Sequence, residues 1–254
     1  MNTALVILPT YNEKENIEKL IGEILAQNLN LDILVVDDNS PDGTGQIIED
    51  LRKNGPGLGL AGSSLLRDCF KPGQDGPQLF ILHREKKEGL GRAYIAGFKW
   101  ALANNYEYIF EMDADFSHQP GYLKDFLKAI KDCDLVIGSR YIKEGGTVGW
   151  SKIRELISRL GCLYAQIILG LKIKDLTGGF KCYRKPVLEK IDLDKIRSNG
   201  YMFQIEMTYS AFKNGFKIKE IPIIFLERKL GKTKFNKKII WEAMINCWKL
   251  RFDL

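Results

Sequence analysis

Two aspartates spaced i, i+2, Asp113 and Asp115, follow a strand-like apolar segment near the middle of the chain, Tyr106–Met112. Aspartates at that spacing on an extended segment point to the same side, so both could approach one divalent cation. Hard oxygen ligands suit Mg²⁺ or Mn²⁺, ions that usually bridge one or two carboxylates to substrate phosphates. The same pattern is also typical of a charged strand end in a solvated turn, so it indicates a metal site only together with its neighbours.

Strand and helix patterns alternate through the first 140 residues, which predicts an α/β fold with a mostly parallel sheet flanked by helices. Ligands of such sheets gather beyond the carboxyl ends of the strands. Asp37 and Asp38 end one predicted strand and Asp113 and Asp115 another, so we expect a single site. The predicted strands are Ala4–Leu8, Leu31–Val36, Leu79–His83, Ile109–Met112 and Leu135–Gly138. The predicted helices are Asn16–Leu25, Thr44–Arg52, Arg92–Asn104 and Leu123–Ile130.

Composition narrows the possible chemistry. The chain has 254 residues with two histidines, His83 and His118, which leaves little for a histidine-based zinc site or a serine–histidine triad. Its five cysteines form no C-x-x-C pair, so buried, reduced thiols are expected.

Residues 1–139 hold 14 Lys and Arg against 21 Asp and Glu, whereas residues 140–254 hold 24 against 11. This asymmetry indicates an acidic metal-binding half and a basic half that faces anions. No basic motif interleaved with aromatic residues is present, so nucleic acid is not an expected partner.

Three segments outside the alternating pattern differ in character. Residues 54–78 are rich in Gly, Pro and Ser and predict a long surface loop. Helical periodicity returns over Trp150–Leu171, whose longest uncharged run is too short to span a bilayer. Lys238–Leu250 predicts a helix with a wide apolar face, which is typical either of a core or dimer interface or of insertion into a membrane surface.

An ordered series of short motifs accompanies the Asp-x-Asp pair. They are Pro9-Thr10-Tyr11-Asn12-Glu13, Val35–Thr44, Gly89-Leu90-Gly91-Arg92-Ala93, Gly138-Ser139-Arg140-Tyr141 and Asp175-Leu176-Thr177-Gly178-Gly179-Phe180. The chain closely resembles the dolichyl-phosphate (polyprenyl-phosphate) mannosyltransferases, inverting family-two glycosyltransferases with the GT-A nucleotide-sugar fold. The resemblance runs from about Leu5 to Lys234, with an interruption at the 54–78 loop, and fits the short class without transmembrane helices. It implies one GT-A domain over 1–254, with a nucleotide- and metal-binding half (1–139) and an acceptor- and membrane-facing half (140–254).

For the donor side, the resemblance implies that Asp113 and Asp115 hold Mg²⁺ or Mn²⁺, with Asp115 in a catalytic role. A third metal ligand found in some relatives is a Gln two positions further on, where this chain has Ser117, so that water or Ser117 would replace it. The glycines in the series fit a backbone that passes close to the nucleotide, or else a tight turn. The residues implied to bind the nucleotide sugar are Pro9, Tyr11, Glu13, Asp38, Gly89, Gly91, Asp113, Arg228 and Lys234.

For the acceptor side, the resemblance implies that Arg140, Arg154 and Ser158 bind a lipid phosphate, with both arginines also catalytic. Arg154 and Ser158 are i, i+4 on a predicted helix and share a face, and arginine suits bidentate contacts to phosphate. A phosphate monoester is already ionised near neutral pH, so no general base is needed. Gln204 and Glu206 also match a family segment and are expected near the sugar.

The implied reaction transfers mannose from GDP-mannose to a polyprenyl (dolichyl-type) phosphate and gives a β-linked polyprenyl phosphomannose and GDP. Alternatives are a polyprenyl-phosphate glucosyltransferase that uses UDP-glucose, a family-two transferase with a saccharide acceptor, and a non-catalytic protein that binds membrane surfaces. The six basic residues between Arg228 and Lys238 suit an anionic membrane surface. The expected location is cytoplasmic and peripheral on the cytoplasmic face of a membrane, alone or with a small membrane anchor protein.

Overall fold

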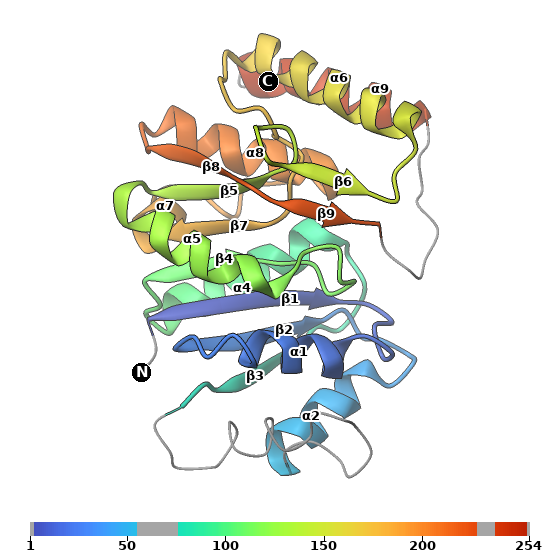
Figure 1. Ribbon diagram of the computed structural model, residues 1–254, viewed down its shortest axis with the longest axis vertical. Helices are drawn as coiled ribbons and strands as arrows, with labels where there is room; N and C mark the ends of the chain where they lie inside the picture. Colours follow the sequence, from blue (N-terminus) through green and yellow to red (C-terminus); the bar gives the residue numbers. More distant parts are fainter. Residues whose placement is uncertain (1–2, 55–75, 228–236, 253–254) are drawn as a thin grey trace.

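A seven-stranded sheet forms the middle layer of the molecule and helices cover both of its faces (Figure 1). The computed structural model describes residues 3–54, 76–227 and 237–252. The strand order is β3-β2-β1-β4-β7-β5-β8. The strands are β1 (Ala4–Thr10), β2 (Leu31–Asp37), β3 (Leu79–His83), β4 (Tyr108–Glu111), β5 (Leu135–Ser139), β7 (Lys181–Arg184) and β8 (Ile218–Pro222).

The N-terminal strands are parallel and end at the same edge. β1 pairs with β2 from Ala4↔Leu31 to Thr10↔Asp37 and with β4 as far as Ile7↔Glu111. Every residue of β1 and β2 is buried, because helices cover both faces, and this explains their nearly continuous apolar sequences. The predicted α/β fold and mostly parallel sheet are confirmed, and all five predicted strands are present.

The two faces of the sheet carry separate hydrophobic cores. Along β1, Val6 and Leu8 face one core and Leu5 and Ile7 the other, as the two-residue period of a strand requires. The first core packs against α1 (Ile17–Leu25), α2 (Thr44–Asn54) and α5 (Leu123–Ala129). The second packs against α4 (Leu90–Ala103), α7 (Lys185–Lys190) and α8 (Gly200–Lys213).

One antiparallel strand joins the two halves of the sequence. β7 lies between β4 and β5 and is antiparallel to both, and β8 then pairs with β5 in parallel. A separate small sheet pairs β6 (Gly146–Val148) with β9 (Ile224–Leu226). Because strands from 1–139 and from 140–254 alternate in one sheet, the acidic and basic parts of the sequence share a single framework.

The last helical layer consists of α6 (Lys152–Leu169) and α9 (Lys237–Phe252), which lie together at one end of the molecule (Figure 1). Ser151 caps α6 by accepting a hydrogen bond from the Arg154 backbone, and Gly170 ends the helix in the left-handed region, with φ 70°. Tyr164 Oη donates to the Met244 carbonyl and accepts from Trp248 Nε1, which ties the two helices together.

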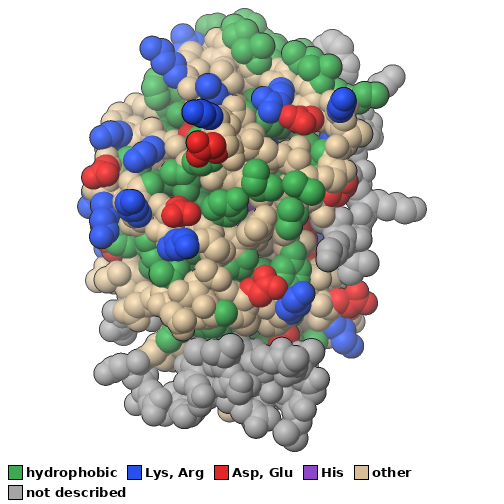
Figure 2. Space-filling model, in the orientation of Figure 1, with side chains coloured by type: hydrophobic (Ala, Val, Ile, Leu, Met, Phe, Trp, Pro, Cys, Tyr) green, Lys and Arg blue, Asp and Glu red, His purple; other side chains and the backbone are tan. Residues whose placement is uncertain are grey.

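Part of the apolar surface of α6 faces outward. Cys162, Ala165 and Leu169 are buried, but a second apolar row is exposed along the helix: Ile153, Leu156, Leu160, Leu163 and Ile167. On α9, Ile245, Trp248 and Phe252 are exposed as well. Figure 2 shows hydrophobic side chains with Lys and Arg beside them at this end of the molecule. None of the helices in the part of the chain that the structure describes is long and apolar enough to cross a membrane.

Candidate active site

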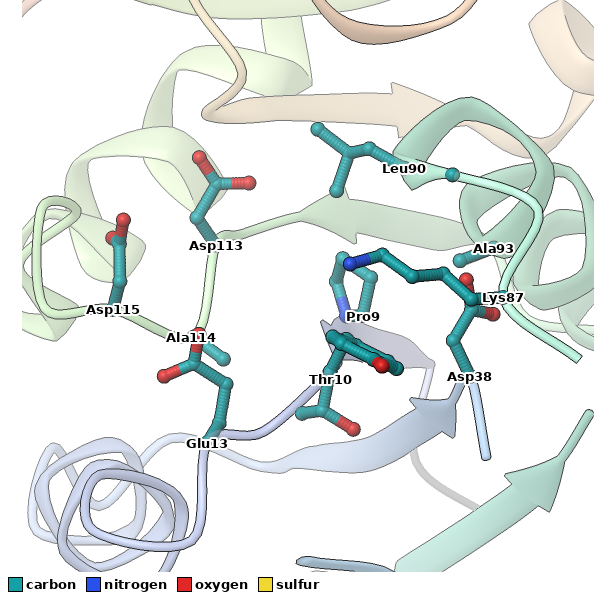
Figure 3. A pocket seen from close by; sticks show the side chains of 12 residues that line it. Pro9, Thr10, Glu13, Asp38, Lys87, Leu90, Ala93, Asp113, Ala114 and Asp115 are labelled. Atoms are coloured by element: carbon teal, nitrogen blue, oxygen red, sulfur yellow. The ribbon is translucent and has the colours of Figure 1, made fainter. Parts of the chain in front are cut away.

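A pocket opens at the carboxyl edge of the sheet, where β1, β2 and β4 end (Figure 3). It brings together residues that lie about 100 positions apart in the sequence, as the positions of the strand ends predict. In Figure 3, Asp113 and Asp115 lie on one side, and Lys87 and Asp38 lie on the other. The lining residues are Pro9, Thr10, Tyr11, Glu13, Asp38, Lys87, Gly89, Leu90, Ala93, Asp113, Ala114 and Asp115.

Asp113 is fixed by two neighbours. Its backbone N–H donates to His118 Nδ1 at 3.0 Å, and its Oδ1 accepts from Tyr94 Oη at 3.1 Å. Burial raises the pKa of Tyr94 well above 10, and the charge of Asp113 raises it further, so the phenol keeps the proton that it donates. Burial also lowers the pKa of His118, which favours the neutral ring that Nδ1 needs in order to accept. His118 therefore supports the loop, and Tyr94 sets the orientation of the carboxylate.

Asp115 is held by Ser117. The Ser117 hydroxyl donates to Asp115 Oδ1 at 2.5 Å and its backbone N–H donates to the same oxygen at 3.0 Å. Phe116 between them has φ 62°, which turns the chain back sharply enough for these contacts. Ser117, predicted as an alternative to water for the third metal ligand, is buried and orients a neighbouring carboxylate.

The two aspartates fit a hard divalent cation that also binds phosphate. Both carboxylates line the same pocket, and residues 3–54, 76–227 and 237–252 contain no group of three or more His, Cys, Asp or Glu side chains that could hold a metal. Two carboxylates with substrate phosphates and water in the remaining positions are the usual arrangement for Mg²⁺, which keeps several waters.

The opposite wall of the pocket carries an aromatic ring and a charged network. Lys87 Nζ lies 3.5 Å from the centroid of the Tyr11 ring, a cation–π contact. Asp38, which is buried, forms an ion pair with Arg84, and Arg84 Nη2 also donates to Glu88 at 2.5 Å. Asp37 lies outside the pocket lining and accepts from Thr10 and Ser40, so it caps the end of β2.

The two predicted glycines have different surroundings. Gly89 lines the pocket and has φ 99°, a conformation that favours glycine. Gly91 is buried and does not line the pocket; a Cβ there would lie 2.7 Å from the Ser198 carbonyl oxygen. The small size of Gly91 therefore lets the 198–199 segment pack against the start of α4.

Five lining residues were not among the predicted site residues, namely Thr10, Lys87, Leu90, Ala93 and Ala114. Lys87 belongs to a mixed charged run, Arg84–Glu88, that is typical of a solvated loop. Its position two residues before the Gly89–Ala93 motif is the one signal that could have identified it.

A second group of basic side chains lies near the N-terminus of α6. Arg140 is buried, and its Nε and Nη2 donate to Asp175 at 2.7 and 2.6 Å. Burial alone would lower the pKa of Arg140 and raise that of Asp175, but each charge stabilises the other, so Arg140 is above and Asp175 below its ordinary value. Arg140 Nη2 also donates to Thr177 at 2.8 Å.

Trp150 connects the two predicted acceptor arginines. The Arg154 and Arg140 guanidinium carbons lie 4.1 and 5.3 Å from the centre of its ring. Arg154 Nη1 donates to Glu227 at 2.5 Å, and Ser158 accepts from Tyr141 Oη at 2.6 Å. The structure thus places Arg140, Arg154 and Ser158 in one region. Arg228 and Lys234 lie outside the described residues, as do residues 55–75 of the predicted loop.

A comparison with known proteins identifies the family of this chain. The model of the glycosyl transferase family 2 matches residues 5–192, about three quarters of the chain. The chain belongs to glycosyl transferase family 2. The matched segment contains the whole pocket described above, so the Asp113–Asp115 pair lies at the carboxyl edge of a family-two glycosyltransferase domain.

Two curated relatives are similar over nearly their whole length. The undecaprenyl-phosphate mannosyltransferase of Micrococcus luteus is 43% identical over 242 residues, which cover 95% of this chain and 91% of the relative. The polyprenol monophosphomannose synthase of Mycolicibacterium smegmatis is 42% identical over 250 residues, which cover 97% and 87%.

Solved structures of lower identity support the fold. The glucosyl-3-phosphoglycerate synthase of Mycobacterium tuberculosis superposes with a TM-score of 0.66 at 16% identity, covering 100% of this chain and 81% of its own. A mannosyltransferase from Pyrobaculum calidifontis, solved with GDP-Man and Mn²⁺, gives a TM-score of 0.60 at 16% identity and covers 99% and 63%. At such identities the likeness concerns the fold, and it confirms the predicted glycosyltransferase architecture.

Proposed function

We propose that this family-two glycosyltransferase transfers mannose from GDP-mannose to a polyprenyl phosphate with inversion, giving polyprenyl β-phosphomannose and GDP. The observation that carries the proposal is the convergence of Asp113 and Asp115 on one pocket in a chain that is 42–43% identical to two polyprenyl-phosphate mannosyl enzymes. Both relatives are matched over nearly their whole length, so the likeness extends to the acceptor half of the chain.

The pocket suits a nucleoside diphosphate sugar. Asp113 and Asp115 would hold Mg²⁺ or Mn²⁺, which supplies a Lewis acid for the charge that develops on the leaving diphosphate. Pro9, Tyr11, Glu13, Asp38 and Gly89 would bind the nucleoside. Lys87 adds a positive charge beside the Tyr11 ring, where a phosphate or the base could bind. Gly91 supports this wall by allowing close packing behind it.

The acceptor phosphate would bind between Arg140, Arg154 and Ser158, with Arg228 and Lys234 as further proposed contacts. Its second pKa lies near ~6, so the dianion is the main form at neutral pH and one oxygen can attack the anomeric carbon without a general base. The new bond joins that oxygen to the carbon while the bond to the diphosphate oxygen breaks, and GDP leaves with the electron pair.

A saccharide acceptor has less support, because a hydroxyl group would need a carboxylate base. Glu206, which is expected near the sugar, accepts a hydrogen bond from the Ser198 backbone at 3.2 Å and is not a lining residue of the pocket. Asp113 and Asp115 line the pocket but are assigned to the cation in this proposal.

The lipid acceptor also suggests where the enzyme works. The exposed apolar row of α6 begins one residue before Arg154, and exposed Lys152, Lys172 and Lys249 lie at the same end of the molecule. An apolar stripe with basic neighbours is typical of helices that lie in the interface of an anionic bilayer. We include peripheral attachment to the cytoplasmic face of a membrane through α6 in the proposal. A small membrane anchor protein would be compatible with it.

Incubation with Mn²⁺, a short polyprenyl phosphate and radiolabelled GDP-mannose or UDP-glucose, followed by extraction into organic solvent, tests this function. Label should enter the lipid phase from GDP-mannose and disappear in Asp115→Ala and Arg154→Ala. Asp132→Ala, at an exposed site away from the pocket, is the matched control and should retain activity. Label from UDP-glucose alone would replace the donor, and no label from either donor would contradict the proposal.

A further inference from the structure

The side chain of Trp150, which lies between β6 and α6, carries a buried hydrogen-bond donor. In the part of the chain that the structure describes, no group accepts a hydrogen bond from its indole nitrogen, Nε1. A buried indole N–H usually finds an acceptor, and leaving it without one costs free energy. An unpaired donor of this kind therefore needs a specific explanation, which the groups around Trp150 supply.

Two guanidinium groups lie against the ring that contains this N–H. The Cζ atoms of Arg154 and Arg140 lie 4.1 and 5.3 Å from the ring centre, within the ~6 Å range of a cation–π contact. A guanidinium has no acceptor atom, so neither arginine can pair with the indole donor. Trp150 Nε1 is thus a donor among other donors, and its acceptor has to come from outside this group.

Both arginines keep N–H groups beyond those that pair with carboxylates. Arg140 donates through Nε and Nη2 to Asp175, and through Nη2 also to Thr177. Arg154 donates through Nη1 to Glu227. Within the described ranges of the chain, no acceptor contacts Arg140 Nη1 or Arg154 Nη2. Several unused donors around one indole ring suit the oxygens of a phosphate group.

The neighbours of Trp150 hold its ring in place. The ring packs in a T-shaped arrangement against Phe225 on β9, with ring centroids 5.5 Å apart. Ser151, the next residue, caps α6 by accepting from the Arg154 backbone N–H, so the first turn of the helix fixes the chain beside Trp150. The indole N–H and the two guanidiniums are therefore positioned before an anion binds, which favours selective recognition.

We propose that the Trp150 indole N–H binds the phosphate of the polyprenyl acceptor, together with Arg140 and Arg154. The inference rests on the proposed function, which assigns the two arginines to that phosphate and gives Trp150 no role. A phosphate monoester has three terminal oxygens that accept hydrogen bonds. Donors on two of them leave the third free to attack the anomeric carbon, so Trp150 binds and orients the nucleophile and transfers no proton.

Replacing Trp150 with β-(3-benzothienyl)alanine tests the N–H alone. In this amino acid a sulfur atom takes the place of the indole N–H, so two fused rings and their contacts with the arginines remain. Loss of a hydrogen bond to a charged group should raise the KM for a short, water-soluble polyprenyl phosphate by ~10- to 100-fold. The KM for GDP-mannose should stay within about twofold. The same replacement at Trp100, which contacts Phe80 and does not line the pocket, is the matched control and should change neither KM.

Two ordinary substitutions separate the donor from the ring. Trp150→Phe keeps a flat ring without the N–H, so its KM for the acceptor should rise as it does in the benzothienyl variant. Trp150→Leu also removes the ring against which both guanidiniums lie, so its KM for the acceptor should rise further. A native acceptor KM in the two variants that keep a ring would overturn the inference. Equal rises in the KM values of both substrates would indicate a merely structural role and overturn it as well.

The resonance of the indole N–H gives a second, direct measurement. In protein with ¹⁵N-labelled tryptophan, the Nε1–H signal of Trp150 is assigned by its loss in Trp150→Phe. It should move downfield, as a proton does when it forms a hydrogen bond, on addition of the short polyprenyl phosphate and not of the corresponding polyprenol. A downfield shift with GDP-mannose and Mg²⁺ but not with polyprenyl phosphate would assign the N–H to the donor diphosphate and overturn the inference. A shift with inorganic phosphate alone would assign it to a free anion, with the same consequence.

These outcomes separate the role of Trp150 from the function on which it rests. If the native enzyme transfers no label from GDP-mannose to polyprenyl phosphate, the proposed function fails. If the native enzyme transfers mannose but the benzothienyl variant keeps the native KM for the acceptor, only the assignment of Trp150 fails.

Discussion

Arg154 donates through Nη1 to Glu227 Oε1 at 2.5 Å, while its guanidinium lies on the face of Trp150. Glu227 directly follows β9, and its backbone N–H donates to the Val148 carbonyl, so its position is set by the small β6–β9 sheet. The carboxylate therefore occupies one edge of the guanidinium that we assign to the acceptor phosphate. An anion that binds at the same edge of Arg154 has to displace Glu227.

Replacing Glu227 with Gln should strengthen acceptor binding. The pair is partly exposed, and such ion pairs stabilise by roughly 0.2–1 kcal/mol, so the KM for polyprenyl phosphate should fall by about 1.5- to 5-fold. The KM for GDP-mannose should not change. Glu155→Gln, which removes a similar pair with Arg159 on the same helix, is the control. An unchanged acceptor KM in Glu227→Gln would show that the carboxylate does not compete.

Removing the Ser117 hydroxyl should weaken the metal site without abolishing it. Ser117 donates to Asp115 Oδ1, and loss of a group that orients a metal ligand typically costs ~10- to 100-fold in metal affinity. The Mn²⁺ concentration needed for half-maximal activity should rise accordingly in Ser117→Ala, and maximal activity should largely return at high Mn²⁺. Failure of excess Mn²⁺ to restore activity would instead indicate a direct role in the reaction.

The sequence was sufficient to locate the pocket because buried parallel strands end abruptly. Apart from Asp32, β1 and β2 are apolar up to their last residues, Thr10 and Asp37, and the polar residues at and after these ends, together with Asp113 and Asp115 after β4, all lie at one edge. Spacing therefore predicted which carboxylates converge. The antiparallel strand β7 has only four residues and no alternating pattern, so its insertion between β4 and β5 could not be predicted.

Contacts between distant residues account for most of what the sequence did not predict. Glu227 contacts Arg154 across 73 positions in the sequence, and the close approach of the Ser198 carbonyl requires a glycine at position 91. Neither contact has a local sequence signal. Periodicity predicted an apolar face on α6, but it cannot show whether protein or solvent covers that face. Likewise, Lys87 reaches the pocket because its loop folds over Tyr11, a tertiary effect.

Breaking the Asp175–Arg140 pair should destabilise the fold. Asp175 accepts three hydrogen bonds from Arg140, from its backbone N–H, Nε and Nη2. Removing one partner of a buried pair costs about 3–5 kcal/mol, so Asp175→Asn should lower the free energy of unfolding by an amount of that order. Urea titration measures it, and Asp132→Asn at an exposed site should leave the free energy unchanged.

The Asp175–Arg140 pair also predicts how the stability of the fold changes with pH. The pKa of Asp175 lies below its ordinary value of 3.8 in the folded protein, so its contribution is fully present above that pH and is lost as the pH falls through the folded pKa. The difference in stability between native protein and Asp175→Asn should therefore be constant near neutrality and shrink in acid. A difference that grows below pH 3.8 would contradict this assignment.

The apolar row of α6 should decide membrane attachment. Ile153 and Ile167 are 72% and 71% exposed at opposite ends of the helix, and neither supports the core beneath it. Partial burial of each side chain in a bilayer contributes about 1 kcal/mol, so Ile153→Ser with Ile167→Ser should reduce partitioning onto anionic vesicles by roughly 10- to 30-fold.

The matched control for this pair is Phe212→Ser, which removes an exposed apolar side chain from α8. Both variants should retain native transfer to a short, water-soluble polyprenyl phosphate in solution, because the replaced side chains are exposed and do not line the pocket. Co-sedimentation with vesicles measures the partitioning. Equal vesicle binding by the double variant and the native enzyme would mean that another surface attaches the protein. The outward-facing row would then be left for a protein partner, such as an anchor that covers α6.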